Sequence, residues 1–219
     1  MLSARATRSS PRRTPGATAQ IVVIPRERWA LRPESTLAHT THTSVSIAPN
    51  VRRQLTLFVA GPWASRLEAL RHALDPVQAS LIGAHVTVCR EDEIEGASPS
   101  ALFNRVEAWV AGPIRMGFGQ PERFDGHGVL LPCVHGSREF NRLRQWVLQE
   151  RYAREHRAHI TLAHPRNPRS AGNTDAALAA WADVLELQFE VVALIEQLGS
   201  GPWRVLQEAT LGSTAHGVA

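Results

Sequence analysis

The chain has 219 residues and 24 Arg and Lys residues against 20 Asp and Glu residues, which gives a formal net charge of +4. All 24 cations are arginine; seven arginines and two acids lie in residues 1–50, so this segment carries +5 and residues 51–219 carry −1. A nearly neutral body lacks the basic face of a duplex-DNA clamp, and no apolar run approaches the ~18 residues of a membrane span.

Residues 1–50 are rich in Arg, Ser and Thr and poor in acids, so we expect a basic, disordered N-terminal arm. The same composition also fits an organelle transit peptide, and both readings stay open. No secretory apolar segment is present. Cys89 and Cys133 lie in apolar runs and indicate reduced, buried thiols. Together these features favour a cytoplasmic protein whose folded domain covers residues 51–219, and we expect a monomer.

Short strands and helices alternate from residue 51 onward, with Gly, Pro and N-cap residues at their ends. The alternating patterns predict strands over 54–60, 85–90, 114–124, 128–134, 159–163, 187–198 and 203–211. The helical periodicities predict helices over 62–74, 98–111, 137–150 and 174–184. In the second helix, the residues expected on one side are Leu102, Val106, Trp109 and Val110. The pattern is that of an α+β protein with meandering antiparallel strands.

The chain also repeats itself. A predicted helix with Leu70-Arg71 is followed by Ala-His-Val-Thr-Val at 84–88, and one with Leu143-Arg144 is followed by Ala-His-Ile-Thr-Leu at 158–162. This repetition predicts a bilobal, internally duplicated fold.

Each repeated segment places one histidine and one threonine on the same face of a strand, because side chains alternate between faces. The pairs are His85 with Thr87 and His159 with Thr161. If a pseudo-twofold axis relates the repeats, all four side chains meet in one cleft. Two imidazoles can supply a general base and a general acid near neutral pH, and two hydroxyls can donate to phosphoryl oxygens. This set suits hydrolysis of a cyclic phosphodiester and requires no metal or other cofactor.

The sequence resembles the 2H phosphoesterase superfamily, and within it the 2′-5′ RNA ligase-like (LigT-like) and cyclic phosphodiesterase group. The resemblance is carried by His85–Val88, His159–Leu162 and the opening strand Leu57–Ala60 before Pro62. It implies two lobes of antiparallel sheet around a central cleft, with helices on the outside. It also implies metal-independent action on 2′,3′-cyclic or 2′-5′-linked nucleotide phosphates. Many members have Pro before the second motif, where this chain has Ala158.

Further residues could contact the substrate. Arg90 follows the first motif and could bind phosphate or pair with a neighbouring acid. Tyr152 and Arg157 precede the second motif and could stack on a base or contact phosphate. The spacing of His156, His159 and His164 does not suit a metal site. Many family members have a basic residue shortly after the second motif, where this chain has His164 followed by Pro165-Arg166.

The sequence therefore predicts a phosphodiesterase that acts on a nucleotide or a single-stranded RNA terminus, with no part for duplex DNA or a membrane. His85 and His159 are the expected catalytic pair, in an order that stays open, and Thr87 and Thr161 are the expected phosphate ligands. Three alternatives remain: a nucleotide- or RNA-end-binding module with little turnover, 2′-5′ RNA ligation by the same four residues, and a purely structural duplicated fold in which the motifs are incidental.

Overall fold

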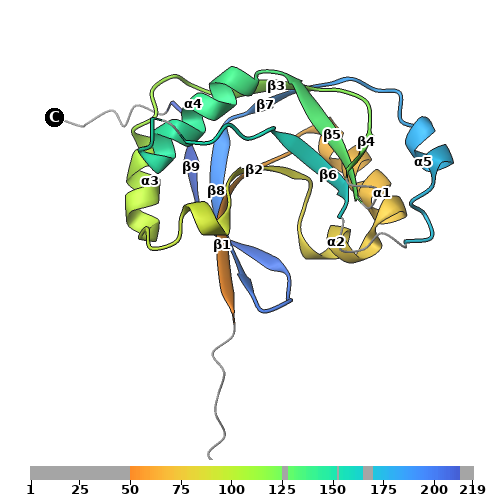
Figure 1. The fold of residues 1–219 in the computed structure, drawn as a ribbon, viewed down its shortest axis with the longest axis horizontal. Helices are drawn as coiled ribbons and strands as arrows, with labels where there is room; N and C mark the ends of the chain where they lie inside the picture. Colours follow the sequence, from red (N-terminus) through yellow and green to blue (C-terminus); the bar gives the residue numbers. More distant parts are fainter. Residues whose placement is uncertain (1–49, 125–127, 152, 165–169, 213–219) are drawn as a thin grey trace, which may run out of the picture. The chain divides into compact units, whose positions relative to one another are not determined.

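The computed structural model describes residues 50–124, 128–151, 153–164 and 170–212. These residues form two antiparallel sheets with helices packed against them (Figure 1). The strands are β1 (Val51–Phe58), β2 (His85–Cys89), β3 (Ile114–Phe118), β4 (Glu122–Phe124), β5 (Gly128–His135), β6 (His159–Ala163), β7 (Leu185–Phe189), β8 (Val191–Leu198) and β9 (Trp203–Thr210). The helices are α1 (Pro62–Leu74), α2 (Pro76–Leu81), η1 (Glu91–Glu93, 3-10), α3 (Pro99–Glu107), α4 (Ser137–Leu148) and α5 (Asp175–Ala179). The N-terminal arm predicted from the sequence lies outside the described residues, apart from Asn50.

Local sequence sets the ends of the helices that frame the cleft. α1 begins at Pro62 directly after Gly61, whose φ of 69° favours glycine. Asp75 ends α1 and caps α2, because its carboxylate accepts a hydrogen bond from the backbone N–H of Gln78 at 3.0 Å. Asp75-Pro76 therefore ends one helix and begins a second that the sequence analysis missed.

The two sheets draw on distant parts of the chain. The four-stranded sheet has the order β2-β1-β8-β9; the five-stranded sheet has the order β4-β5-β3-β7, with β6 also paired to β5. The predicted strand 187–198 is in fact two strands in different sheets, β7 and β8, separated only by Glu190. The predicted strand 114–124 is likewise divided into β3 and β4 around Pro121, which has no N–H for a ladder.

The internal duplication is confirmed by strand register. In the first unit, Phe58 of β1 pairs with His85 and Thr56 with Thr87. In the second unit, β5 pairs with β6 in the same way. The matching pairs there are Pro132 with His159 and Leu130 with Thr161. Each ladder also has its register shift at the same step, between Leu55 and Thr56 and between Val129 and Leu130.

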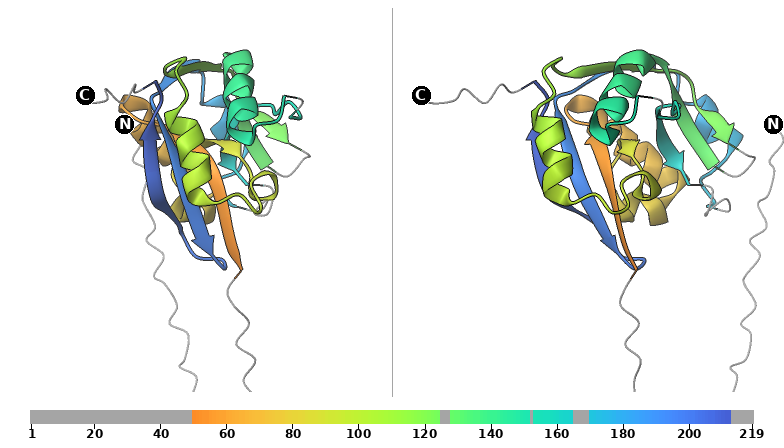
Figure 2. Two further views of the ribbon diagram at one scale, coloured as in Figure 1. Left: turned by 90° about the vertical axis from the view of Figure 1, so that its left-hand side faces the viewer. Right: turned by 60° about the vertical axis from the view of Figure 1, so that its left-hand side comes forward.

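One hydrophobic core joins both sheets and the helices. α1 packs against β6, while α4 packs against β2 and β3, so each of these helices contacts the motif strand of the other repeat. α3 packs against α4 and β9, and the turned views show it beside the four-stranded sheet (Figure 2). Leu102, Val106 and Trp109 are buried as expected, but Val110 follows the helix and is 80% exposed, which corrects its expected inward position. Within the described ranges, no helix is both long enough and apolar enough to cross a membrane.

Candidate active site

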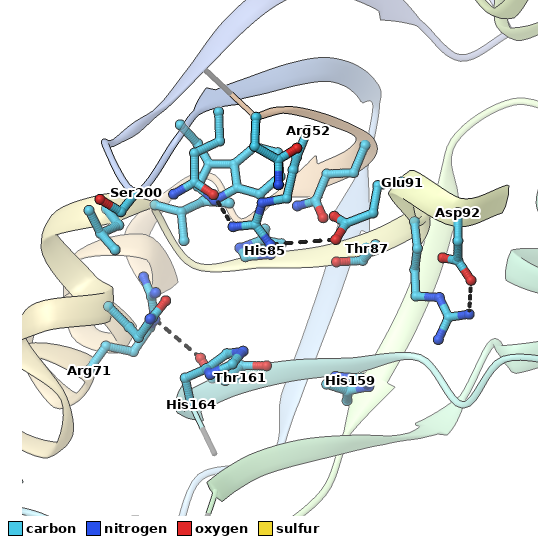
Figure 3. Close-up of a pocket in the computed structure, with 18 of the residues that line it drawn as sticks. Arg52, Arg71, His85, Thr87, Glu91, Asp92, His159, Thr161, His164 and Ser200 are labelled. Carbon is cyan, nitrogen blue, oxygen red and sulfur yellow. Dashed lines mark hydrogen bonds and ion pairs between the residues drawn. The ribbon is translucent and has the colours of Figure 1, made fainter. Parts of the chain in front are cut away.

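A cleft of about 980 Å³ lies where the two motif strands face each other. It is lined by all four side chains of the predicted site: His85 and Thr87 from β2, and His159 and Thr161 from β6. In Figure 3 the two strands run on opposite sides of the cleft, with His85 and Thr87 on one and Thr161 and His159 on the other. The alternation expected from the sequence holds, because Val86, Val88, Ile160 and Leu162 on the other faces are buried in the core.

Both motif histidines are held in the same tautomer. Nδ1 of His85 lies 2.7 Å from the carbonyl oxygen of Gly83, and Nδ1 of His159 lies 2.9 Å from that of Arg157. A carbonyl oxygen can only accept, so each Nδ1 carries the proton and donates it. In each ring, Nε2 is therefore the nitrogen left to exchange a proton in the cleft.

The two motif histidines do not share the same electrostatic setting. Burial lowers the pKa of His85 to about 4, and the nearby charges of Arg71 and His159 act in the same direction. The His85 imidazole is consequently neutral at neutral pH, with its Nε2 lone pair available. A bound phosphodiester anion would raise this pKa by stabilising the imidazolium form.

A third histidine lies beside His159. His156 lines the cleft, and its ring centroid is 5.7 Å from that of His159. Asn141 of α4 holds its backbone, since the amide oxygen accepts from the His156 N–H at 3.0 Å. Burial, followed by the charge of Arg144, lowers the pKa of His156 to about 4, so this ring is also neutral at neutral pH.

Two buried arginines tie each repeat to the motif strand of the other. Arg71 of α1 is 3% exposed, and its Nε donates to the carbonyl oxygen of Thr161 at 3.2 Å. Arg144 of α4 is 1% exposed and donates to the carbonyl oxygen of Val88 in β2. Each arginine also pairs with an acid, Arg71 with Glu68 and Arg144 with Glu93. These are the arginines of the repeated Leu-Arg pair, and together they form a reciprocal brace between the two halves.

A carboxylate adds a second link between α1 and the segment after β6. Asp75 is fully buried, and its Oδ2 accepts a hydrogen bond from the backbone N–H of His164 at 2.9 Å. His164 lines the cleft five residues after His159. Pro165 and Arg166, which follow it, lie outside the described residues.

The other predicted contacts have mixed outcomes. Arg90 forms an ion pair with Asp92 at 2.7 Å, as one of its two expected roles requires; it also lines the cleft, and its contact with phosphate stays a prediction. Arg157 is not among the residues that line the cleft; its side chain is 66% exposed and pairs with Glu122 at 2.9 Å, because the chain turns it away before β6. Tyr152 lies outside the described residues.

Neither of the two cysteines is among the residues that line this cleft. Cys89 is fully buried and does not line the cleft, although it follows Thr87 by two residues. Burial raises the pKa of its thiol to about 12, which makes it a poor nucleophile. Cys133 is half-buried rather than buried, and both thiols are free. Among the described residues, no group of three His, Cys, Asp or Glu side chains is arranged to hold a metal ion.

The sequence analysis missed one whole end of the cleft. Its lining residues come from β1 and from the β8–β9 hairpin: Asn50, Arg52, Gln54, Gln197, Gly199, Ser200 and Trp203. No local motif marks them. Their placement depends on the pairing of β1 with β8, which are far apart in sequence.

Comparison with known proteins identifies the family and agrees with the fold. Residues 59–200 match the family model described as the 2′-5′ RNA ligase superfamily. No curated protein gives a significant sequence match to the chain.

Among solved structures, the chain is similar to Escherichia coli LigT complexed with NADP+, with a TM-score of 0.52 and 14% identity. It is also similar to the protein TT0787 of Thermus thermophilus, with a TM-score of 0.52 and 17% identity. Each match covers 74% of this chain and 98% of the other chain. These structures share the fold, and the family model covers well over half of the sequence. The chain therefore belongs to the 2′-5′ RNA ligase superfamily, the group of 2H phosphoesterases that its two motifs resemble.

Proposed function

We propose that this protein is a metal-independent phosphodiesterase that hydrolyses 2′,3′-cyclic or related phosphodiesters of nucleotides or RNA termini. One observation carries the proposal: two imidazoles with the same tautomer and two threonines, in the same strand register, line one cleft. LigT, a relative of the same fold, has been crystallised with NADP+, which supports a nucleotide as the ligand of this cleft.

The proposed step assigns one role to each imidazole. His85 is neutral because burial lowers its pKa to about 4, so its Nε2 accepts a proton from the attacking water. The water oxygen forms a bond to phosphorus as the bond from phosphorus to one sugar oxygen breaks. His159, protonated at Nε2, gives its proton to that leaving oxygen, while its Nδ1–H stays on the Arg157 carbonyl.

Thr87 and Thr161 complete the proposed site. Their hydroxyls donate to the non-bridging oxygens, where negative charge rearranges in the transition state. The base, the acid and the two donors together account for the whole step, so it needs no metal. If the 5′-hydroxyl of a second RNA end replaces water, its oxygen bonds to phosphorus as the bond to the 3′ oxygen breaks, and the same step gives 2′-5′ ligation.

The test is turnover of 2′,3′-cyclic AMP by the purified full chain and its variants. His85→Ala and His159→Ala are each expected to lower kcat by about 10²-fold or more, the usual contribution of a general acid or base. Thr87→Val and Thr161→Val remove only a hydroxyl and should lower kcat less than the histidine variants do. His72→Ala, which alters an exposed histidine of α1 outside the cleft, is the matched control and should keep full turnover.

The results separate the proposal from its alternatives. Unchanged turnover in either folded histidine variant would overturn the assigned roles. Binding of 3′-AMP by the wild type without product from any cyclic phosphate would make the protein a binding module. Formation of a 2′-5′ bond from two RNA ends, faster than hydrolysis, would favour ligation.

A further inference from the structure

Three side chains form a row across the end of the cleft that the sequence analysis missed. Arg52 of β1 pairs with Gln197 of β8, and Gln197 pairs with Trp203 of β9. Residues directly opposite each other in antiparallel strands present their side chains on one face. All three line the cleft, so this face is the one that the ligand meets.

The three side chains of the row are held together by contacts with one another. The guanidinium of Arg52 lies over the indole of Trp203, with Cζ 5.3 Å from the ring centroid, and it donates a hydrogen bond to the side-chain oxygen of Gln197. Gln197 is 3% exposed, and its amide nitrogen donates to the carbonyl oxygen of Gly201 at 2.5 Å. The result is a flat cation stacked on a flat ring, a combination on which nucleobases stack.

The backbone of the row lies at a distance from the motif residues. Along β1, Arg52 precedes Thr56, the partner of Thr87, by four residues, and it precedes Phe58, the partner of His85, by six. At about 3.3 Å per residue, these offsets correspond to roughly 13 and 20 Å. On this backbone spacing, a base further along the same strand reaches the row more readily than the base attached to the reacting phosphodiester.

The charged residues that line the cleft suit a short single strand of RNA rather than a duplex. The cleft is lined by three arginines (Arg52, Arg71, Arg90) and two acids (Glu91, Asp92). Arg90 pairs with Asp92 at 2.7 Å, and Arg52 approaches Glu91 at 3.5 Å. With so little net charge, stacking has to supply most of the binding free energy at this end.

From this placement we propose that Arg52, Gln197 and Trp203 form a base-stacking subsite for a nucleotide upstream of the reacting one. The substrate is then the end of a single-stranded RNA oligonucleotide, and a cyclic mononucleotide fills only part of the cleft. This inference rests on the proposed function, because it takes His85 and His159 as the reacting end.

The experiment compares two substrates: 2′,3′-cyclic AMP and a tetranucleotide RNA that ends in a 2′,3′-cyclic phosphate. For the wild type, kcat/KM is expected to be about 10- to 100-fold higher for the tetranucleotide, the range typical of one stacked base. In Trp203→Ala this ratio should fall toward one, mainly through KM. Trp203→Phe keeps an aromatic face and should keep most of the ratio.

Trp146→Ala is the matched control, because Trp146 of α4 is 47% exposed and does not line the cleft. It should leave both kcat/KM values unchanged. A wild-type ratio near one, or an unchanged ratio in folded Trp203→Ala, would overturn the subsite.

A binding measurement tests the stacking subsite independently of the proposed function. The probe is a tetranucleotide with a plain 3′-phosphate, titrated against the fluorescence of the full chain. If neither cyclic substrate is turned over, the proposed function fails. The subsite then stands only if this probe binds the wild type about 10-fold or more tightly than it binds Trp203→Ala.

Discussion

The guanidinium of Arg71 in α1 donates a hydrogen bond to the main-chain carbonyl of Thr161 in β6, 3.2 Å away. The helix belongs to the first repeat and the strand to the second, and Arg144 makes the reciprocal bond to Val88 of the first motif strand. A main-chain acceptor fixes the strand rather than one side chain. The brace therefore sets the spacing between the two His-x-Thr faces, on which the proposed acid–base catalysis depends.

Replacing Arg71 should alter the chemistry as well as the stability. Arg71→Gln removes the charge that helps to lower the pKa of His85, so that pKa should rise from about 4 toward its ordinary value. The acid limb of the kcat/KM profile for 2′,3′-cyclic AMP should then move to higher pH. The lost bonds to Thr161 and Glu68 should lower the free energy of unfolding by about 1–3 kcal/mol.

Two further variants show whether the effect is specific. Arg71→Lys keeps a positive charge, so its acid limb should lie close to the pH at which it lies in the wild type. Arg66→Gln on the same helix removes an exposed arginine that pairs with Asp183, and it should move neither the limb nor kcat. An unshifted acid limb in Arg71→Gln would leave Arg71 with a purely structural role.

Acid should destabilise the fold through two half-buried histidines. The pKa values of His85 and His156 are lowered from 6.5 to about 4, so each ring binds protons more tightly in the unfolded chain. Their contribution to stability is full above pH 6.5 and is lost as the pH falls toward 4.

Urea unfolding measures this effect directly. The free energy of unfolding should be lower at about pH 5 than at about pH 7.5, and His156→Asn should reduce that difference by about 1 kcal/mol. The exposed-histidine variant His72→Asn should leave the difference as it is in the wild type. An equal difference in His156→Asn and the wild type would argue against a half-buried, neutral His156.

Removal of residues 1–49 should leave hydrolysis of 2′,3′-cyclic AMP intact, because every proposed catalytic group lies in the body of the chain. The deletion must stop there, since Asn50 lines the cleft and its carbonyl accepts a hydrogen bond from the N–H of Gly199 at 2.8 Å. The measurement is kcat/KM for the deletion variant beside the full chain. A folded variant without turnover would show that the arm takes part in the reaction.

The sequence predicted the bounds of those helices and strands whose ends are marked by nearby residues. α1 and β6 have the bounds expected, because Gly61-Pro62 and Asp75-Pro76 mark one and strict alternation marks the other. The division of 187–198 between two sheets could not be predicted in this way. Its apolar pattern runs on without interruption, and only tertiary pairing decides that β7 joins one sheet and β8 the other.

The same distinction applies to the site. The four motif residues were predictable, because each pair lies within three residues of one strand and the two segments are nearly identical. The Leu-Arg repeat was visible as well, but the carbonyl partners of Arg71 and Arg144 were not. The row of Arg52, Gln197 and Trp203 depends on two long-range strand pairings, and nothing within one short segment could reveal it.

The place of β1 between β2 and β8 has a consequence for how the protein is made. Val51 of β1 pairs with Leu198 of β8, so the first strand of the described residues cannot complete its pairing until a strand far along the chain has been synthesised. Until then, β1 is paired only with β2 and has an open edge, and long-range pairing of this kind is slow. A chain that stops before β8 does not lose a peripheral hairpin. It loses a central strand of the sheet that carries His85, so the proposed catalytic site should form only after β8 has been synthesised.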